Sequence, residues 1–250
     1  MELTLQHTLF PLVLAFIAAA YAAVGQAGAT GYIAAMGLAG FAPDVIRPAA
    51  LALNTLVAAI GTARFARAGH LTWRATYPFI LLGLPFSILG GATHLPAHIY
   101  KPVVGALLIV AAWQMARLAR SARATGQPAV APPLLASLVA GAAIGFVAGV
   151  TGIGGGIFVA PLVLWLRWLD MRHTAGLSAL FNLLNSAAAL AGVWGTSPKL
   201  PGELPWWLAA VAVGAALGSW LGVRHLAPSV LRYILAALLL AGGAWMLIGR

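Results

Sequence analysis

Long apolar stretches, interrupted at short intervals, dominate this sequence and restrict what it can fold into. Hydrophobic residues make up 62% of the 250-residue chain and charged residues only 7%, whereas a soluble domain carries about 25% charged residues. The chain therefore has too little polar sequence to cover a soluble core of this size. We predict an all-α polytopic membrane protein. The chain has no cysteine, which excludes disulfides and thiolate chemistry.

The apolar stretches number about ten, each bounded by charges, proline or glycine. They are residues 8–24, 29–42, 47–64, 75–93, 98–116, 134–150, 153–168, 174–194, 205–223 and 229–248. A helix of about 20 apolar residues crosses a bilayer, so we expect about ten membrane segments. The predicted organisation is a first membrane repeat over 1–118, a cytoplasmic linker over 119–133 and a second membrane repeat over 134–250.

Four short matches in the same order indicate that the two halves are repeats. VGQAGATGYIAA (24–35) matches AGVTGIGGGIFV (148–159) at an offset of 124, which pairs Gly28 with Gly152. LALNTL (51–56) matches ALFNLL (179–184) at an offset of 128, which pairs Asn54 with Asn182. Two weaker matches, around tryptophans, follow at offsets of 133 and 132.

The basic residues favour one orientation in the membrane. With all ten segments taken as crossing and the N-terminus outside, ten of the 14 Lys and Arg residues fall in inside loops and four outside. The positive-inside rule supports this orientation, with both termini outside the cytoplasmic (inner) membrane. Five segments per half is an odd number, so the two repeats would be inverted relative to each other, as in many secondary transporters.

Glycines interrupt the segments at matching places, over 25–31 and over 149–156. The segment 29–42 has only fourteen residues, and Pro161 interrupts 153–168. We therefore predict short, broken or re-entrant segments in each half, which point to a substrate site near the midplane. Backbone N–H groups at the start of such a helix carry partial positive charge and bind anions. Close packing of helices through small residues is the alternative explanation.

Polar residues that follow the breaks complete the candidate site. Asn54 and Asn182 occupy matching positions, and Ser178 and Asn185 share a helix face with Asn182. Hydrogen bonds between helices are the alternative role for such asparagines. Tyr32, Phe158 and Phe181 are expected to contact an organic part of the ligand. The predicted substrate-binding residues are Gly25, Gln26, Gly28, Thr30, Asn54, Thr151, Gly152, Gly154, Gly155, Gly156, Ser178, Phe181, Asn182 and Asn185.

The acidic residues and missing motifs narrow the function further. Glu2, Asp44, Asp170 and Glu203 are the only acids, and all lie away from predicted mid-membrane depth, which suits an anionic ligand. The sequence has no Walker A loop and no catalytic constellation, so we predict secondary or facilitated transport and no enzyme activity. We expect no cofactor, no metal and no nucleic-acid partner. The lipid bilayer and a small anion are the expected partners, while a coupling ion (proton or sodium) and a homodimer stay open.

Two stretches resemble a known family. The arrangement A-G-V-T-G-I-G-G-G-x-F-x-x-P-L (148–162), followed by T-A-G-L-S-A-L-F-N-L-L-N-S (174–186), is similar to the second-half signature of the TauE/SafE family of sulfite and organosulfonate transporters, also called 4-toluene sulfonate uptake permeases. The resemblance implies a permease that moves sulfite, sulfonates or related carboxylates. The resulting hypothesis is alternating-access transport of a small organic sulfur anion. A channel-like anion pore and a carrier for a non-sulfur carboxylate are the alternatives.

Overall fold

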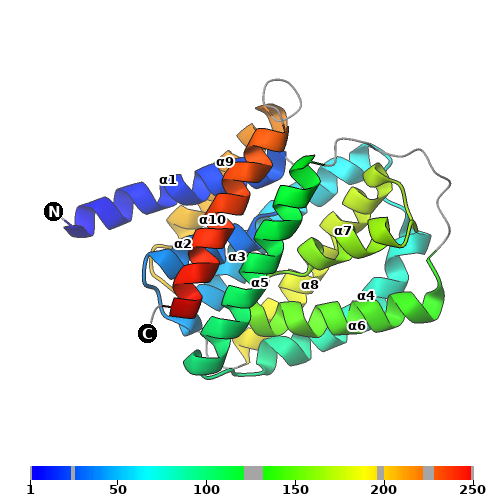
Figure 1. Cartoon of the computed structure of the whole chain (residues 1–250), viewed down its shortest axis with the longest axis horizontal. Coiled ribbons are helices and arrows are strands. Elements are labelled where there is room, and N and C mark those ends of the chain that lie inside the picture. The colour runs from blue at the N-terminus through cyan, green and yellow to red at the C-terminus, as the bar shows by residue number, and fades with distance from the viewer. Residues whose placement is uncertain (1, 24–25, 121–131, 196–199, 222–227, 249–250) are drawn as a thin grey trace.

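The computed structural model describes residues 2–23, 26–120, 132–195, 200–221 and 228–248 (Figure 1). Ten α-helices contain most of these described residues. No strand occurs within these ranges. The helices are α1 (Glu2–Ala23), α2 (Ala29–Leu38), α3 (Pro43–Arg67), α4 (Trp73–Ala92), α5 (Ala97–Arg120), α6 (Leu134–Thr151), α7 (Gly156–Trp165), α8 (Met171–Trp194), α9 (Leu204–Leu221) and α10 (Pro228–Ile248). Each predicted segment overlaps one of them, so the all-α prediction is confirmed. The predicted linker over 119–133 lies mostly outside the described residues, and α5 continues to Arg120.

Helix length distinguishes two short helices from five that could cross a membrane. The five, α3, α4, α5, α6 and α8, are long and apolar enough over their described residues to cross a membrane. By contrast, α2 and α7 have 10 residues each, which gives a length of about 15 Å, half of a hydrocarbon core of about 30 Å. Neither short helix can cross a bilayer as a helix alone. The charge count takes all ten segments as crossing the membrane. The orientation that it favours therefore stays a prediction.

The interruption in the second half lies before α7, and not at Pro161 as predicted. Pro161 is inside α7, and the helix continues past it to Trp165. The chain instead leaves the helical conformation between Thr151 and Gly156, where Gly152, Gly154 and Gly155 have positive φ angles. A left-handed backbone is cheap only for glycine. The glycines, and not the proline, therefore shorten this segment.

Small residues bring pairs of helices close together. A Cβ atom added at Gly141 or Gly145 of α6 would overlap the backbone of Phe79 or Gly83 in α4. Gly214 and Gly218 of α9 meet the backbone of α1 in the same way. Such close approach is the usual way in which membrane helices pack. Gly149 belongs to this group, since it lies inside α6 against Ser87, so its predicted place in the glycine break is wrong.

The helix pairs follow a consistent pattern along the chain. α3 packs against α8, and α5 packs against α10 (Figure 1). The pair α4–α6 corresponds to the pair α9–α1 when the first five helices are exchanged with the last five. The short helices α2 and α7 pack on α3 and α8, respectively. This arrangement brings both glycine breaks beside the two helices that carry Asn54 and Asn182.

Candidate functional site

Each short helix starts from a glycine in the left-handed conformation. Gly28 precedes α2 with a φ of 95°, and Gly155 precedes α7 with a φ of 83°. The two helix starts therefore pair Gly28 with Gly155, an offset of 127, in place of the offset of 124 predicted from the glycine pattern. The corrected register agrees with the offset of 128 that relates Asn54 to Asn182. Gly31, which the sequence match pairs with Gly155, lies inside α2 against Ile17 and Tyr21.

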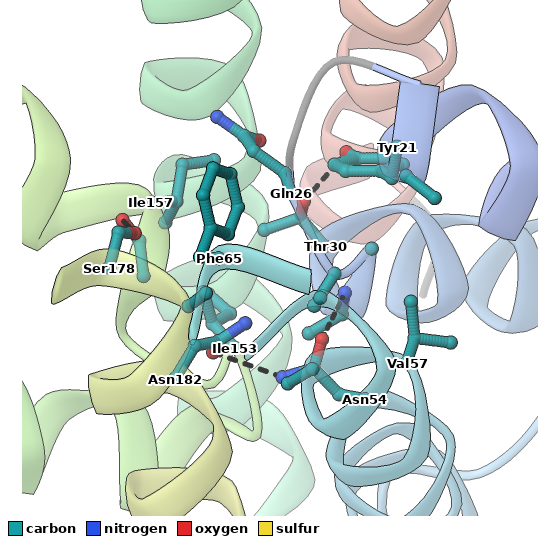
Figure 2. A pocket seen from close by; sticks show the side chains of 18 of the residues that line it. Tyr21, Gln26, Thr30, Asn54, Val57, Phe65, Ile153, Ile157, Ser178 and Asn182 are labelled. Atoms are coloured by element: carbon teal, nitrogen blue, oxygen red, sulfur yellow. Dashed lines mark hydrogen bonds between the residues drawn. The ribbon is translucent and has the colours of Figure 1, made fainter. Parts of the chain in front are cut away.

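A pocket lies where the two breaks meet α3 and α8 (Figure 2). It encloses about 590 Å³ of empty space, counting its open mouth. The wall comes from the end of α1, the first break and the start of α2, the second half of α3, the second break with the start of α7, and α8. The lining residues are Tyr21, Ala22, Gln26, Ala27, Gly28, Ala29, Thr30, Asn54, Val57, Ala58, Gly61, Arg64, Phe65, Ile153, Gly156, Ile157, Ser178, Ala179 and Asn182.

A chain of hydrogen bonds joins the matching asparagines to the start of α2. The backbone N–H of Ala29 donates to Asn54 Oδ1 over 2.9 Å. Asn54 Nδ2 donates to Asn182 Oδ1 over 3.0 Å and to Ser186 Oγ over 2.8 Å. Asn54 and Asn182 are both buried, and both line the pocket (Figure 2). The pair thus has the alternative role, because it bonds helices together, and it also faces the pocket, where contact with a ligand stays a prediction.

The described wall of the pocket contains several hydrogen-bond donors and no acidic side chain. Arg64 is the one charged residue among its described lining residues, and neither Asp nor Glu is present there. Ser178 donates to the Gly156 carbonyl over 3.0 Å, and the hydroxyls of Tyr21 and Thr30 pair at 2.7 Å. The first N–H groups of α2 and α7 add partial positive charge. This environment favours a ligand that accepts hydrogen bonds and carries negative charge.

Part of the predicted site lines the pocket. Gln26, Gly28, Thr30, Asn54, Gly156, Ser178 and Asn182 are lining residues. Thr151, Gly152, Gly154, Gly155, Phe181 and Asn185 are buried but absent from that wall. Gly25 lies outside the described residues. A ligand contact from any of these residues stays a prediction.

The predicted residues behind the wall have other neighbours. Thr151 is held by its surroundings: its hydroxyl donates to the Val147 carbonyl over 2.7 Å, and its own carbonyl accepts from Tyr100 over 2.9 Å. Phe181 packs edge-on against Phe79, with ring centroids 6.5 Å apart. Asn185 is buried, and its amide has no hydrogen-bond partner within the described part of the chain.

At three of the predicted glycines, neighbouring atoms leave too little room for a side chain. Gly152 lies against Arg47, Gly154 against the asparagine pair, and Gly155 against Phe181 and Asn185. A side chain at any of them would push these neighbours apart. Their burial therefore explains the glycines without any ligand contact.

Sequence reasoning missed much of the apolar side of the wall, and it favoured the cytoplasmic surface over the pocket for Arg64. Tyr32 and Phe158, expected to contact an organic group, are absent from the described lining residues, where Phe65, Ile153 and Ile157 are found instead. On α3 the lining residues are Asn54, Val57, Ala58, Gly61, Arg64 and Phe65. These positions follow the spacing of one helix face. Extending that face from Asn54 would have found Arg64 from the sequence.

Arg47 lies near the start of α3, on the N-terminal side of Asn54. Arg47 is only 8% exposed and belongs to α3, so the prediction that it is a loop charge is wrong, while its side of the membrane stays a prediction. Nη1 donates to the Thr93 carbonyl over 2.7 Å, Nη2 donates to the carbonyls of Gly90 and Gly91, and Nε donates to the Gly149 carbonyl over 3.1 Å. These carbonyls lie at the C-terminal ends of α4 and α6, the negative ends of the helix dipoles.

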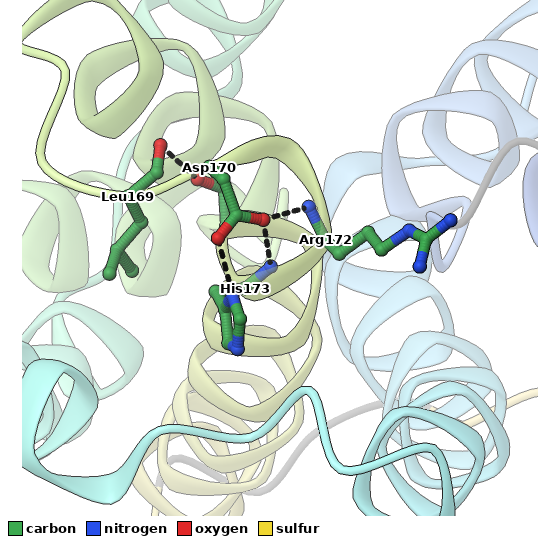
Figure 3. A network of polar contacts seen from close by, with 5 residues as sticks. Leu169, Asp170, Arg172 and His173 are labelled. Atoms are coloured by element: carbon green, nitrogen blue, oxygen red, sulfur yellow. Dashed lines mark hydrogen bonds and ion pairs between the residues drawn. The ribbon is translucent and has the colours of Figure 1, made fainter. Parts of the chain in front are cut away.

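The start of α8 is fixed by Asp170, outside the predicted membrane span (Figure 3). Its carboxylate accepts from the backbone N–H groups of Arg172 and His173, over 2.9 and 3.2 Å, and also pairs with the His173 ring. The hydrogen bond from the His173 side chain is the main reason why the pKa of Asp170 lies below its usual value, and the two backbone N–H groups act in the same direction. This cap sets where the helix that carries Asn182 begins.

Comparisons with known proteins agree with a membrane transporter. The profile of the family described as sulfite exporter TauE/SafE matches residues 10–246. The chain is 53% identical over 233 residues to the probable membrane transporter protein y4hK of Sinorhizobium fredii, covering 92% of this chain and 94% of that relative. No solved structure matches the chain. Since the family profile and the relative both extend over nearly the whole sequence, this chain belongs to the TauE/SafE family of membrane transporters.

Proposed function

We propose that this protein is a secondary transporter of a small sulfur oxyanion, either a sulfonate or sulfite. The observation that carries the proposal is the pocket at the meeting point of the two breaks. It offers the Asn182 amide, the Arg64 guanidinium and the starts of two short helices, with no acid among its described lining residues. The family description names sulfite, and sulfite and sulfonates are acceptor-rich anions that fit such donors.

The wall of the pocket suits an organic group as well as an anionic head. Phe65, Ile153 and Ile157 supply an apolar wall beside the polar groups. A sulfonate with a short alkyl or aryl group would match both parts of the wall.

Alternating access accounts for the difference between the two ends of α3. Arg64, which lines the pocket, is exposed, whereas Arg47 near the other end is buried and holds the ends of α4 and α6 together. With the orientation that the basic residues favour, the pocket opens to the cytoplasm. Transport would then require the contacts of Arg47 to separate when the two inverted repeats move against each other. A proton or sodium ion would supply the driving force.

Ligand-induced stabilisation of the purified protein tests the substrate class. A ligand that binds only the folded state raises the melting temperature in a concentration-dependent way. We expect sulfite, methanesulfonate or 4-toluenesulfonate to raise it, and acetate to raise it less at equal ionic strength. Stabilisation by carboxylates alone would support the carboxylate carrier instead.

Transport in proteoliposomes tests the mechanism. We expect uptake of the stabilising anion to saturate with concentration. Arg64→Gln should weaken the affinity about tenfold, because one charged hydrogen bond contributes about 1.5–3 kcal/mol, and it should leave the melting temperature of the ligand-free protein unchanged. Flux that does not saturate and needs no coupling ion would favour the anion pore.

A further inference from the structure

The two matching asparagines have different tasks in the pocket. We infer that Asn54 is a positioning residue, which turns the amide of Asn182 so that its NH₂ group faces the ligand. On this assignment Asn182 binds the anion and Asn54 acts only through Asn182. The inference rests on the proposed function, since it names the group that recognises an oxyanion in the same pocket.

The direction of the hydrogen bonds begins at the backbone. The N–H of Ala29 can only donate, so the Asn54 side-chain atom 2.9 Å from it must be the carbonyl oxygen. The Asn54 nitrogen therefore points the other way, toward α8. Because Ala29 is at the start of α2, its N–H is one of the four that have no partner inside the helix. The fold itself thus sets the orientation of Asn54.

The orientation of Asn182 follows from that of Asn54. The Asn54 nitrogen can only donate, so Asn182 must present its oxygen to it, over 3.0 Å. The dashed line in Figure 2 joins the oxygen of Asn182 to Asn54, and the nitrogen of Asn182 does not take part in this bond. No hydrogen bond from this nitrogen to an acceptor is found within the described part of the chain, although Asn182 lines the pocket. Its NH₂ group therefore has donors free for a ligand.

The single hydrogen bond between the two asparagines has one donor and one acceptor. The bond to Ala29 decides that Asn54 donates. A pocket that presents NH₂ at this point selects ligands that accept hydrogen bonds, such as sulfite and sulfonates, and rejects ammonium groups and metal cations.

Isosteric carboxylates test the inference. In Asn54→Asp the carboxylate still accepts from Ala29 but can no longer donate, so the Asn182 amide should turn its NH₂ group toward position 54 and its oxygen toward the ligand. Asn182→Asp keeps the bond from Asn54 and puts an oxygen in place of the NH₂ group. We expect each change to weaken binding of the best oxyanion of the panel at least thirtyfold.

Changes at Ser186 are the matched controls. Ser186→Ala removes one acceptor of Asn54 but keeps the direction of the bonds, so affinity should stay within about threefold of the natural protein. Ser186→Asp adds a negative charge to the same group of residues, and Asn54 can still donate to it. Its affinity measures the effect of charge alone and should exceed that of Asn54→Asp at least threefold. Equal affinities of these two variants would overturn the inference.

A readout without ligand separates the inference from the proposed function. We would follow the side-chain NH₂ signals of ¹⁵N-asparagine-labelled protein in detergent. The Asn182 signal should exchange fast in the natural protein and become protected in Asn54→Asp. If no oxyanion binds, the proposed function fails, but this protection still tests the inference. Fast exchange in both proteins would overturn it whatever the ligand.

Discussion

The two glycine breaks each precede a helix of ten residues, but they contribute differently to the pocket. The first break has one described glycine with a positive φ, Gly28, and supplies a continuous part of the pocket wall over 26–30. The second has three such glycines, yet only Ile153 and the helix start at Gly156 and Ile157 reach the wall. The number of glycines therefore marks how crowded a break is, and not how much of the pocket wall it supplies.

The crowding has identifiable causes. Gly152 meets the side chain of Arg47, and Gly154 lies where any Cβ atom would overlap both Asn54 and Asn182. At the corrected offset of 127, Gly154 corresponds to Ala27, so the first break already has a side chain at the matching position. The second break packs against the asparagine pair, while the first supplies a continuous part of the pocket wall.

The largest expected effect comes from adding a methyl group to the second break. Gly154→Ala forces alanine into a left-handed conformation, which costs about 1 kcal/mol, and into the atoms of the asparagine pair, which costs about 1–3 kcal/mol more. The free energy of unfolding in detergent should fall by about 2–4 kcal/mol, and oxyanion binding should be lost. The reverse change in the first break, Ala27→Gly, should cost less than about 1 kcal/mol. Equal effects of the two changes would show that the breaks are equivalent.

The second largest effect is a loss of stability on substitution of Arg47. Its local consequences should be confined to the second break. Arg47→Met leaves the carbonyls of Gly90, Thr93 and Gly149 without their donor, which should lower the free energy of unfolding by about 2–3 kcal/mol. Hydrogen–deuterium exchange should rise over 149–155 but not over 26–30. Arg47→Lys, which keeps the charge but loses the planar fork, should give an intermediate result. A uniform rise in exchange would argue against a local role.

A smaller change, an increase in stability, is expected from a substitution at Asn185, which is buried behind the pocket wall. Asn185 corresponds to the apolar Val57 at the offset of 128, but its buried amide has no partner in the described chain. Asn185→Leu should therefore leave stability unchanged or raise it by about 1 kcal/mol, with transport retained. Loss of transport in this variant would instead support the predicted ligand contact of Asn185.

The smallest effect concerns the starts of the two helices that carry the asparagines. Asp170 caps α8, whereas Ala42 precedes α3 without a side-chain cap. Since the pKa of Asp170 is lowered by folding, its contribution to stability is complete above the usual aspartate pKa of about 4 and is lost as the pH falls through the folded value. Thermal unfolding between about pH 3 and 6 should be less pH-dependent in Asp170→Asn. An unchanged pH profile would mean that the cap does not contribute.

The sequence by itself determined the elements and the neighbourhood of the site. The length and composition of the apolar stretches depend only on local residues, so the ten helices could be located before any contact was known. The glycine pattern located both breaks for the same reason, because a left-handed backbone excludes most side chains. The matching asparagines followed from comparing one half of the chain with the other.

Only the tertiary structure decided the register of the breaks and the partners of the polar groups. The offset of 127 depends on where each short helix begins, and several nearby glycines satisfy a sequence match equally well. The burial of Arg47 depends on carbonyls of α4 and α6, more than 40 and 100 residues away in sequence. The polarity of the asparagine pair depends on one backbone N–H. Such contacts join residues distant in the chain, and a composition or spacing rule, which describes only neighbours, contains no information about them.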